Sequence, residues 1–99
     1  MALVIDPAER EVDALRKVMD WRGKHILEIG CGDGRLTLRL ASLRPRKIYA
    51  IDPEEWLIRT ARKQKPNKYA DRIRYGVAHA EKLRFPSFTF DAVVFSWAL

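Results

Sequence analysis

The sequence predicts an α/β domain with a mostly parallel sheet, and two observations support this. Apolar runs of strand length alternate along the chain with amphipathic segments of helix length, and turn or capping residues such as Gly34, Pro45 and Pro66 separate them. Strands that alternate with helices fold as right-handed βαβ units, which place the strands parallel in one sheet. With 99 residues, the chain is expected to form a single domain, residues 1–22 supplying an N-terminal helix and residues 23–99 the βα units.

Capping residues and periodicity place the individual elements. Asp6-Pro7-Ala8-Glu9 has the residues of a helix start, and one apolar face follows it until Gly23. Asp52-Pro53-Glu54-Glu55 repeats that start, and Pro66 ends the helix that follows. The inner face of this second helix is expected to hold Leu57, Thr60, Ala61 and Gln64. The expected elements are helix 6–22, strand 25–29, helix 34–43, strand 47–52, helix 53–65, strand 72–77 and strand 92–97.

The stretch from Glu28 to Gly34 indicates a ligand-binding loop. An apolar strand ends in glycines at positions 30, 32 and 34, and an amphipathic helix follows at once. Glycine lets the backbone come close to a ligand, and N–H groups at a helix start suit an anionic group. The spacing differs from the dinucleotide pattern G-x-G-x-x-G, whose third glycine would fall at Arg35. A tight turn between strand and helix, without a ligand, is the alternative.

The pattern E-x-G-x-G-x-G closely resembles the first motif of the class I S-adenosylmethionine-dependent methyltransferases. The strand that ends at Asp52, the loop 78–86 and Phe90-Asp91 resemble later motifs of that family in matching order, so the resemblance covers about residues 20–99. It implies a Rossmann-like sheet with strand order 3-2-1-4, truncated relative to the seven strands of the family. It also implies a methyltransferase, or its cofactor-binding portion, that takes S-adenosyl-L-methionine as cofactor and an acceptor that the sequence does not identify.

The resemblance also implies roles for particular residues. Asp52 would accept hydrogen bonds from both ribose hydroxyls, or it caps the helix that follows. Glu28, a charge in an apolar strand, would hold the methionine amino group directly or through water, or it is satisfied by N–H groups of the loop. The expected cofactor-binding residues are Glu28, Gly30, Cys31, Gly32, Gly34, Asp52, Pro53, His79, Ala80 and Ser96.

One stretch departs from the family pattern. Many members carry Gly-Asp-Ala where this chain has Ala78-His79-Ala80, and the aspartate accepts a hydrogen bond from the adenine amino group. A neutral imidazole could accept that bond, and the N–H of Ala80 could meet the adenine ring. The alternative is that His79 is an exposed loop residue. Trp56 and Trp97 could line an adenine or substrate pocket, or pack in the core.

Neither a catalytic residue nor a metal site is predicted. Cys31 is the only cysteine, and it is expected to be a small loop residue because methyl transfer needs no nucleophile from the protein. Two histidines and one cysteine are too few and too scattered to bind a metal. A single cysteine also excludes an internal disulfide, which is compatible with the reducing cytoplasm. No signal peptide is expected at the N-terminus, and no apolar run approaches the ~20 residues of a membrane span.

Charge and the last strand suggest two kinds of partner. The net charge is +6, and seven basic residues fall between positions 59 and 74. This cluster could attract nucleic acid, but without an interleaved nucleic-acid motif a solvated helix face is preferred. Strand 92–97, central in the family fold, should be an edge here and is apolar on both faces. Because such an edge can pair with another chain, a homodimer or a contact with another chain is predicted through residues 91–99.

Three functions therefore remain open from the sequence. The first is an S-adenosylmethionine-dependent methyltransferase. The second is a non-catalytic module that binds the same cofactor or regulates another protein. The third is a basic RNA-associated protein that retains the fold.

Overall fold

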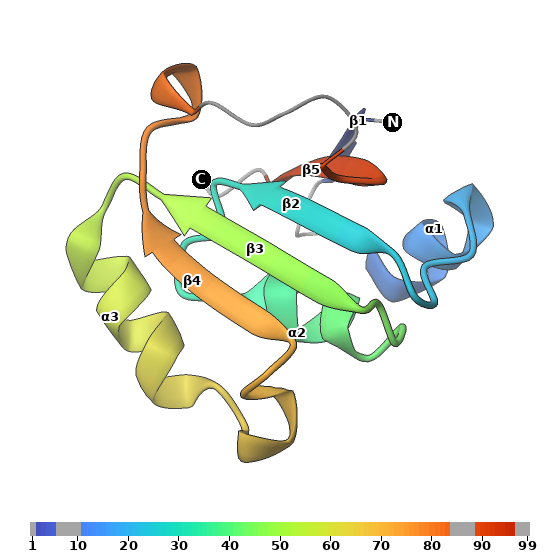
Figure 1. Cartoon of the computed structure of the whole chain (residues 1–99), viewed down its shortest axis with the longest axis horizontal. Coiled ribbons are helices and arrows are strands. Elements are labelled where there is room, and N and C mark those ends of the chain that lie inside the picture. The colour runs from blue at the N-terminus through green and yellow to red at the C-terminus, as the bar shows by residue number, and fades with distance from the viewer. Residues whose placement is uncertain (1, 6–10, 84–88, 97–99) are drawn as a thin grey trace.

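A parallel sheet with helices packed on one face makes up the part of the chain that the computed structural model describes, residues 2–5, 11–83 and 89–96 (Figure 1). The strands are β1 (Ala2–Ile5), β2 (His25–Ile29), β3 (Lys47–Asp52), β4 (Ile73–Val77) and β5 (Ala92–Ser96). The helices are α1 (Glu11–Val18), α2 (Arg35–Ala41) and α3 (Glu55–Gln64), with single turns η1 (Asn67–Tyr69) and η2 (Ala80–Lys82). The predicted α/β class is therefore confirmed.

The strands lie in the order β1-β5-β2-β3-β4, and all neighbours are parallel. The four strands expected from the sequence keep the predicted order 3-2-1-4, which corresponds here to β4-β3-β2-β5. The chain builds outward from β2 to β4 and then returns to the other side of β2. Ligands of open parallel sheets bind at the carboxyl ends of the strands beside such a reversal. The topology therefore directs attention to the loops that follow β2, β3 and β5.

The prediction that the last strand forms an edge of the sheet is wrong. β1 pairs with β5 along its length, from Ala2 opposite Val93 to Ile5 opposite Ser96. A four-residue apolar stretch carries no clear periodicity, so the sequence did not indicate a strand there. The edge strands are instead β1 and β4. The predicted start of the N-terminal helix, Asp6–Glu9, and Trp97 both lie outside the described residues.

The hydrophobic core lies between the sheet and the three helices. One cluster joins Leu15 of α1, Leu36 and Leu40 of α2, and Ile58 of α3 to alternate residues of the strands, so the helices share one face of the sheet. The N-terminal helix ends at Val18, earlier than the predicted stop near Gly23. The chain then turns inward, and the buried indole of Trp21 donates to the carbonyl oxygen of Leu15 at 2.7 Å.

The predicted inner face of α3 is partly wrong. Ile58 and Ala61 are its buried residues, whereas Gln64 is exposed. α3 begins at Glu55 rather than at Pro53. A Cβ placed on Gly34 would lie 3.3 Å from the Cβ of Ala61, so a small residue at position 61 lets α3 approach the glycine loop closely.

Two cations cover the outer edge of β4. The guanidinium of Arg62 donates to the carbonyl oxygen of Tyr75 at 3.1 Å, and the ammonium of Lys65 donates to that of Ile73 at 3.0 Å. These carbonyl groups point away from β3, where a further strand would otherwise pair. Charged side chains along an edge oppose such pairing.

Candidate functional site

Three loops converge at the carboxyl ends of the central strands. The glycine loop, residues 30–34, joins β2 to α2, while Asp52 ends β3 and Ser96 ends β5. In the sheet, Ile29 is opposite both Ile51 and Phe95, so these three strand ends lie side by side. The site predicted from residues far apart in the sequence is thus brought together at the point that the topology selects.

Each glycine of the loop has a backbone conformation that L-residues rarely adopt. The φ angles are +80° at Gly30, +56° at Gly32 and +89° at Gly34. A Cβ on Gly30 would lie 2.9 Å from the carbonyl oxygen of Ser96, and one on Gly34 would overlap the hydroxyl of Tyr75. Gly30 and Gly34 therefore allow close packing of β5 and β4 around the loop, in addition to the turn itself.

Four N–H groups of the loop are bonded within the protein. Gly30 and Cys31 donate to the carbonyl oxygen of Ile51 at 2.9 and 3.0 Å, and Gly34 donates to that of Cys31 at 3.0 Å. Gly32 donates to the carboxylate of Asp52 at 3.0 Å. These four donors are used by acceptors that the sequence did not reveal, while the expectation that N–H groups in the first turn of α2 suit an anion stays a prediction.

Carboxylates surround the loop instead. Burial raises the pKa of the Cys31 thiol, and the negative charges of Glu28, Asp52 and Asp33 raise it further. The thiol is thus held in its neutral form, which agrees with the prediction that Cys31 is a small loop residue and not a nucleophile. A site lined by acidic groups favours a ligand that carries positive charge and hydroxyl donors, and disfavours a diphosphate.

Asp52 holds the loop and α3 together. Its Oδ2 accepts the bond from Gly32, and its Oδ1 accepts one from the N–H of Glu54 at 2.9 Å, at the start of α3. The helix-capping alternative is not confirmed, because the N-cap of α3 is Glu54 and Asp52 accepts only from the N–H of that cap residue. A carboxylate has about four lone-pair positions, so it retains capacity for ligand hydroxyls. The side chain is mostly buried, with 6 % of the residue exposed.

Glu28 lies fully buried beneath the loop, at the centre of a polar network. Its two carboxylate oxygens accept hydrogen bonds from the hydroxyls of Thr37 and Ser96. Both alternatives drawn from the sequence missed these partners, because neither loop N–H groups nor solvent reach the carboxylate. Burial raises the pKa of Glu28 from 4.5 to about 7, and the nearby Asp52 adds to the rise, while the bonds from Ser96 and Thr37 act against it.

Thr37 and Tyr75 are the members of this network that sequence reasoning missed. Thr37 is fully buried in α2 and also bonds to the Tyr75 hydroxyl, and burial raises the pKa of Tyr75 so that its phenol stays neutral. The available signal for Thr37 was its position in the sequence, because it is a polar residue next to Leu36 on the inner face of α2. Nothing in the sequence indicated that Tyr75 would reach the glycine loop from β4.

The remaining predicted residues lie at the rim. Pro53, His79 and Ala80 are exposed, and Nδ1 of His79 lies 4.0 Å from a carboxylate oxygen of Glu81. Trp56, in the first turn of α3, is 62 % exposed, which excludes the core-packing interpretation for this residue. His79 and Trp56 are thus accessible to a ligand at the carboxyl end of β3, whereas Glu28 and Gly34 are buried.

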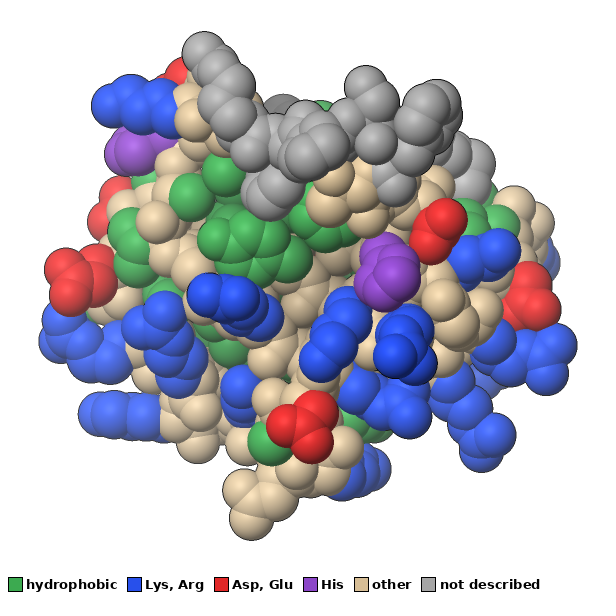
Figure 2. Space-filling model, in the orientation of Figure 1, with side chains coloured by type: hydrophobic (Ala, Val, Ile, Leu, Met, Phe, Trp, Pro, Cys, Tyr) green, Lys and Arg blue, Asp and Glu red, His purple; other side chains and the backbone are tan. Residues whose placement is uncertain are grey.

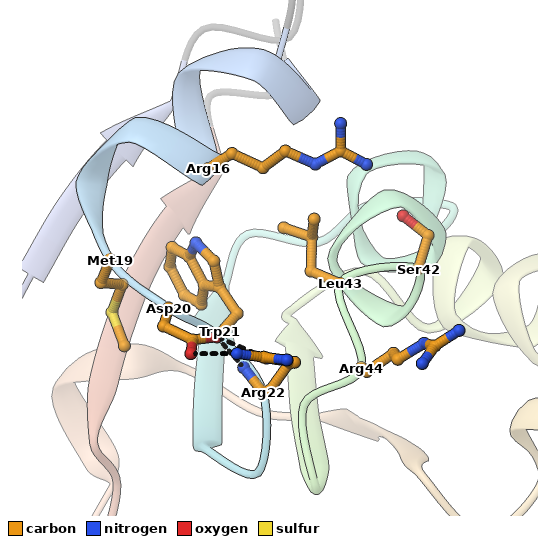
Figure 3. Close-up of a pocket in the computed structure, with 8 residues that line it drawn as sticks. All are labelled: Arg16, Met19, Asp20, Trp21, Arg22, Ser42, Leu43 and Arg44. Carbon is orange, nitrogen blue, oxygen red and sulfur yellow. Dashed lines mark hydrogen bonds and ion pairs between the residues drawn. The ribbon is translucent and has the colours of Figure 1, made fainter.

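Cavities also occur away from this site. Figure 3 shows one of about 440 Å³ that is lined by α1, the turn around Trp21 and the turn around Arg44. These turns precede β2 and β3, so the cavity lies at the amino ends of the strands, opposite the glycine loop. Within the described residues, no group of three or more potential ligands could hold a metal ion. No helix among them is long and apolar enough to cross a membrane.

A parallel α/β sheet with a glycine loop and an acidic residue at adjacent strand ends defines a nucleoside-cofactor domain. Comparison with known proteins identifies the family. A model described as "Methyltransferase domain" matches residues 26–99. The chain belongs to this methyltransferase domain family.

Individual proteins agree with this assignment. The chain is 36% identical over 80 residues to a demethylmenaquinone methyltransferase of Symbiobacterium thermophilum. It superimposes with a TM-score of 0.74 and 28% identity on an S-adenosylmethionine-dependent methyltransferase from Mesorhizobium loti, covering 87% of this chain and 38% of the other. A phosphoethanolamine N-methyltransferase 1 from Haemonchus contortus, in complex with S-adenosylhomocysteine, gives a TM-score of 0.75 and 26% identity, over 88% of this chain and 18% of the other.

The matched region is a minor part of these proteins. The alignment with the Symbiobacterium protein covers 78% of this chain but 32% of that protein. The shared part contains the glycine loop, Asp52 and the strands that carry them.

Proposed function

We propose that the chain binds S-adenosylmethionine at the carboxyl ends of β2, β3 and β5, and that its activity is methyl transfer. The observation that carries this proposal is the chemistry of the loop. The N–H groups of Gly30, Cys31 and Gly32 are bonded within the protein, and carboxylates lie around them. S-Adenosylmethionine carries a sulfonium and an ammonium group, both positive, against one carboxylate, and two ribose hydroxyls that can donate hydrogen bonds. The residues present therefore fit this cofactor.

Particular residues have distinct roles in the proposed site. The remaining lone pairs of Asp52 would accept bonds from the ribose hydroxyls. Ser96, half-buried between Glu28 and the surface, donates its hydroxyl to Glu28, so its oxygen can accept from the ligand ammonium. Glu28 would then act on the ammonium through Ser96 and does not need to reach the surface. His79 and Trp56 would meet the adenine ring.

The cofactor supplies a methyl group that is already activated on sulfur. What remains for the protein is to hold the cofactor in one orientation and to keep water away. The matched proteins act on different acceptors, as their names state. The acceptor of this chain is therefore left unassigned.

Calorimetric titration with S-adenosylhomocysteine tests the proposal. We expect one saturable site, and no binding of NAD at the same concentration, because its diphosphate would face carboxylates. Gly32→Val should abolish binding by closing the approach to the loop. The matched control is Gly23→Val, since Gly23 also has a positive φ, +72°, but open space around it. Absence of binding by the parent chain, or equal loss in both variants, would contradict the proposal.

A second copy of the chain is the proposed protein partner, through β1 and not through β5. β1 is an edge strand of apolar sequence, whereas cations cover the opposite edge at β4. Light scattering at micromolar concentration should give the mass of a dimer, and Val4→Lys should give that of a monomer, because lysine on an edge strand opposes pairing. A monomeric parent chain would contradict this. We propose the cytoplasm as the compartment, since the single cysteine, Cys31, is buried and leaves the chain without an internal disulfide.

A further inference from the structure

Two adjoining cavities form a surface that the methyltransferase site does not use. The first, about 720 Å³, lies along the outer edge of β4 and is lined by Lys47, Arg62, Lys65, Asp71, Arg72 and Arg74 among others. The second, about 520 Å³, lies over the sheet and includes His25, Lys47, Tyr49, Arg74, Thr89 and Phe90. Lys47 and Arg74 line both, so the two cavities are adjacent. We call them together the β3–β4 surface.

Four of the five cations that line the first cavity are held in place by carbonyl oxygens, and Asp71 is the one acidic residue of this lining. Arg62 and Lys65 donate to carbonyl oxygens of β4, and Arg72 donates to that of Pro45 at 2.9 Å. The ammonium of Lys47 likewise donates to the carbonyl oxygen of Asp71. Carbonyl oxygens carry no net charge, so these bonds fix the side chains and leave a positive field. Figure 2 shows Lys and Arg side chains gathered over the lower half of the molecule, where α3 and the turn before β4 lie in Figure 1.

The second cavity adds aromatic rings beside the cations. Tyr49 is paired with Arg74 across β3 and β4, and Lys47, two residues before Tyr49, points to the same face of the sheet. Tyr49 lies across Gly76, because a Cβ at position 76 would be 2.9 Å from its hydroxyl oxygen and 3.0 Å from its ring carbon Cε1. The edge of the ring therefore lies against the backbone at Gly76. Phe90 lines the same cavity from the segment before β5.

We propose that the β3–β4 surface binds single-stranded nucleic acid. Fixed cations along a groove can follow a phosphate backbone, and aromatic side chains on a sheet give bases a stacking platform. The sequence showed the basic cluster but not the platform, because Tyr49 and Phe90 reach it only through the fold. The surface lies toward the amino ends of β3 and β4, away from the glycine loop. The proposal therefore goes beyond methyl transfer and does not depend on it.

Fluorescence anisotropy with a labelled oligouridylate of about 12 nucleotides tests the electrostatic part. With about three phosphate contacts, the affinity should fall about 20-fold between 50 and 200 mM salt. The double variant Lys47→Gln, Arg74→Gln should bind about tenfold more weakly and show a shallower salt dependence. The control, Lys17→Gln with Lys63→Gln, removes the same charge from exposed sites outside both cavities and should bind like the parent chain. Thermal unfolding of each variant verifies that it is folded.

A second variant tests the stacking part. Tyr49→Leu should weaken oligouridylate binding about tenfold and leave the binding of heparin, a polyanion without bases, unchanged. A duplex of the same length should bind more weakly than the single strand, because its bases are not available for stacking. Three results would overturn the proposal. The first is an absence of oligouridylate binding, and the second is a loss of affinity in the control pair as large as that in the double variant. The third is that heparin and the duplex bind as tightly as the single strand does. The last result would leave a general polyanion surface.

Discussion

Replacing Glu28 with glutamine should stabilise the folded chain by about 3 kcal/mol at pH 8 and at the same time weaken cofactor binding. Glutamine has the same shape, and its amide can remain bonded to the hydroxyls of Thr37 and Ser96. The carboxylate, in contrast, must be ionised in a fully buried position above its raised pKa of about 7. The rise from 4.5 to about 7 corresponds to about 3 kcal/mol.

The sign of the pH dependence follows from the same pKa. Below pH 4.5 Glu28 is protonated in both the folded and the unfolded chain. Between pH 4.5 and about 7 the unfolded chain loses this proton while the folded chain retains it, so stability falls as pH rises. Above about pH 7 Glu28 is ionised in both states, so the free energy of unfolding no longer changes with pH through this group. Glu28→Gln should therefore remove this slope and match the parent chain near pH 4.5.

Urea unfolding at pH 4.5, 6 and 8 measures the first effect, and titration with S-adenosylhomocysteine measures the second. Affinity of the parent chain should decrease as pH falls below about 7, because the ligand ammonium favours ionised Glu28. Glu28→Gln should bind more weakly at pH 8 with little pH dependence. A variant that is less stable than the parent chain at pH 8, or that binds equally well, would contradict the roles assigned to Glu28.

Replacing Asp52 with alanine should weaken cofactor binding by about 1.5–3 kcal/mol, the range for losing an acceptor of charge-assisted hydrogen bonds. It should also destabilise the fold by about 2 kcal/mol, because the N–H groups of Gly32 and Glu54 lose their acceptor. The two losses have different causes, so both must be measured, by calorimetry and by urea unfolding.

Asp91→Ala is the matched control for Asp52→Ala. Asp91 also accepts a bond from a backbone N–H, that of His25 at 2.8 Å, but it lies at the opposite end of the sheet. Its replacement should reduce stability without changing the affinity for S-adenosylhomocysteine. If Asp52→Ala lowers stability but leaves affinity unchanged, Asp52 is a structural residue only.

The sequence predicted the limits of helices and strands well where a capping or turn residue ends the element. β2 and β3 have the expected limits, because Gly30 and Asp52 end them by local chemistry. β1 was missed because four apolar residues have no distinctive period, and its partner β5 lies almost at the other end of the chain. The inner face of α3 was predicted partly wrongly for a similar reason, since the packing of this helix depends on how closely Ala61 approaches Gly34.

The sequence indicated which residues lie at the candidate site better than it indicated what each of them contacts. Glu28 stood out as a charge in an apolar strand, but its partners Thr37 and Ser96 are 9 and 68 residues away. The acceptor of the Gly30 and Cys31 N–H groups is a carbonyl oxygen of β3, which no side-chain pattern can indicate. Four N–H groups of the loop are thus occupied by acceptors within the protein, which the sequence pattern of the helix start did not indicate.

NMR titration of ¹⁵N-labelled protein with S-adenosylhomocysteine tests the central claim most directly. Saturable shifts are predicted for the amide signals of Gly30, Gly32 and Gly34, with none for the indole of Trp21, which lines the cavity at the opposite end of the sheet. Shifts of the Trp21 indole, with the three glycine signals unmoved, would contradict the account.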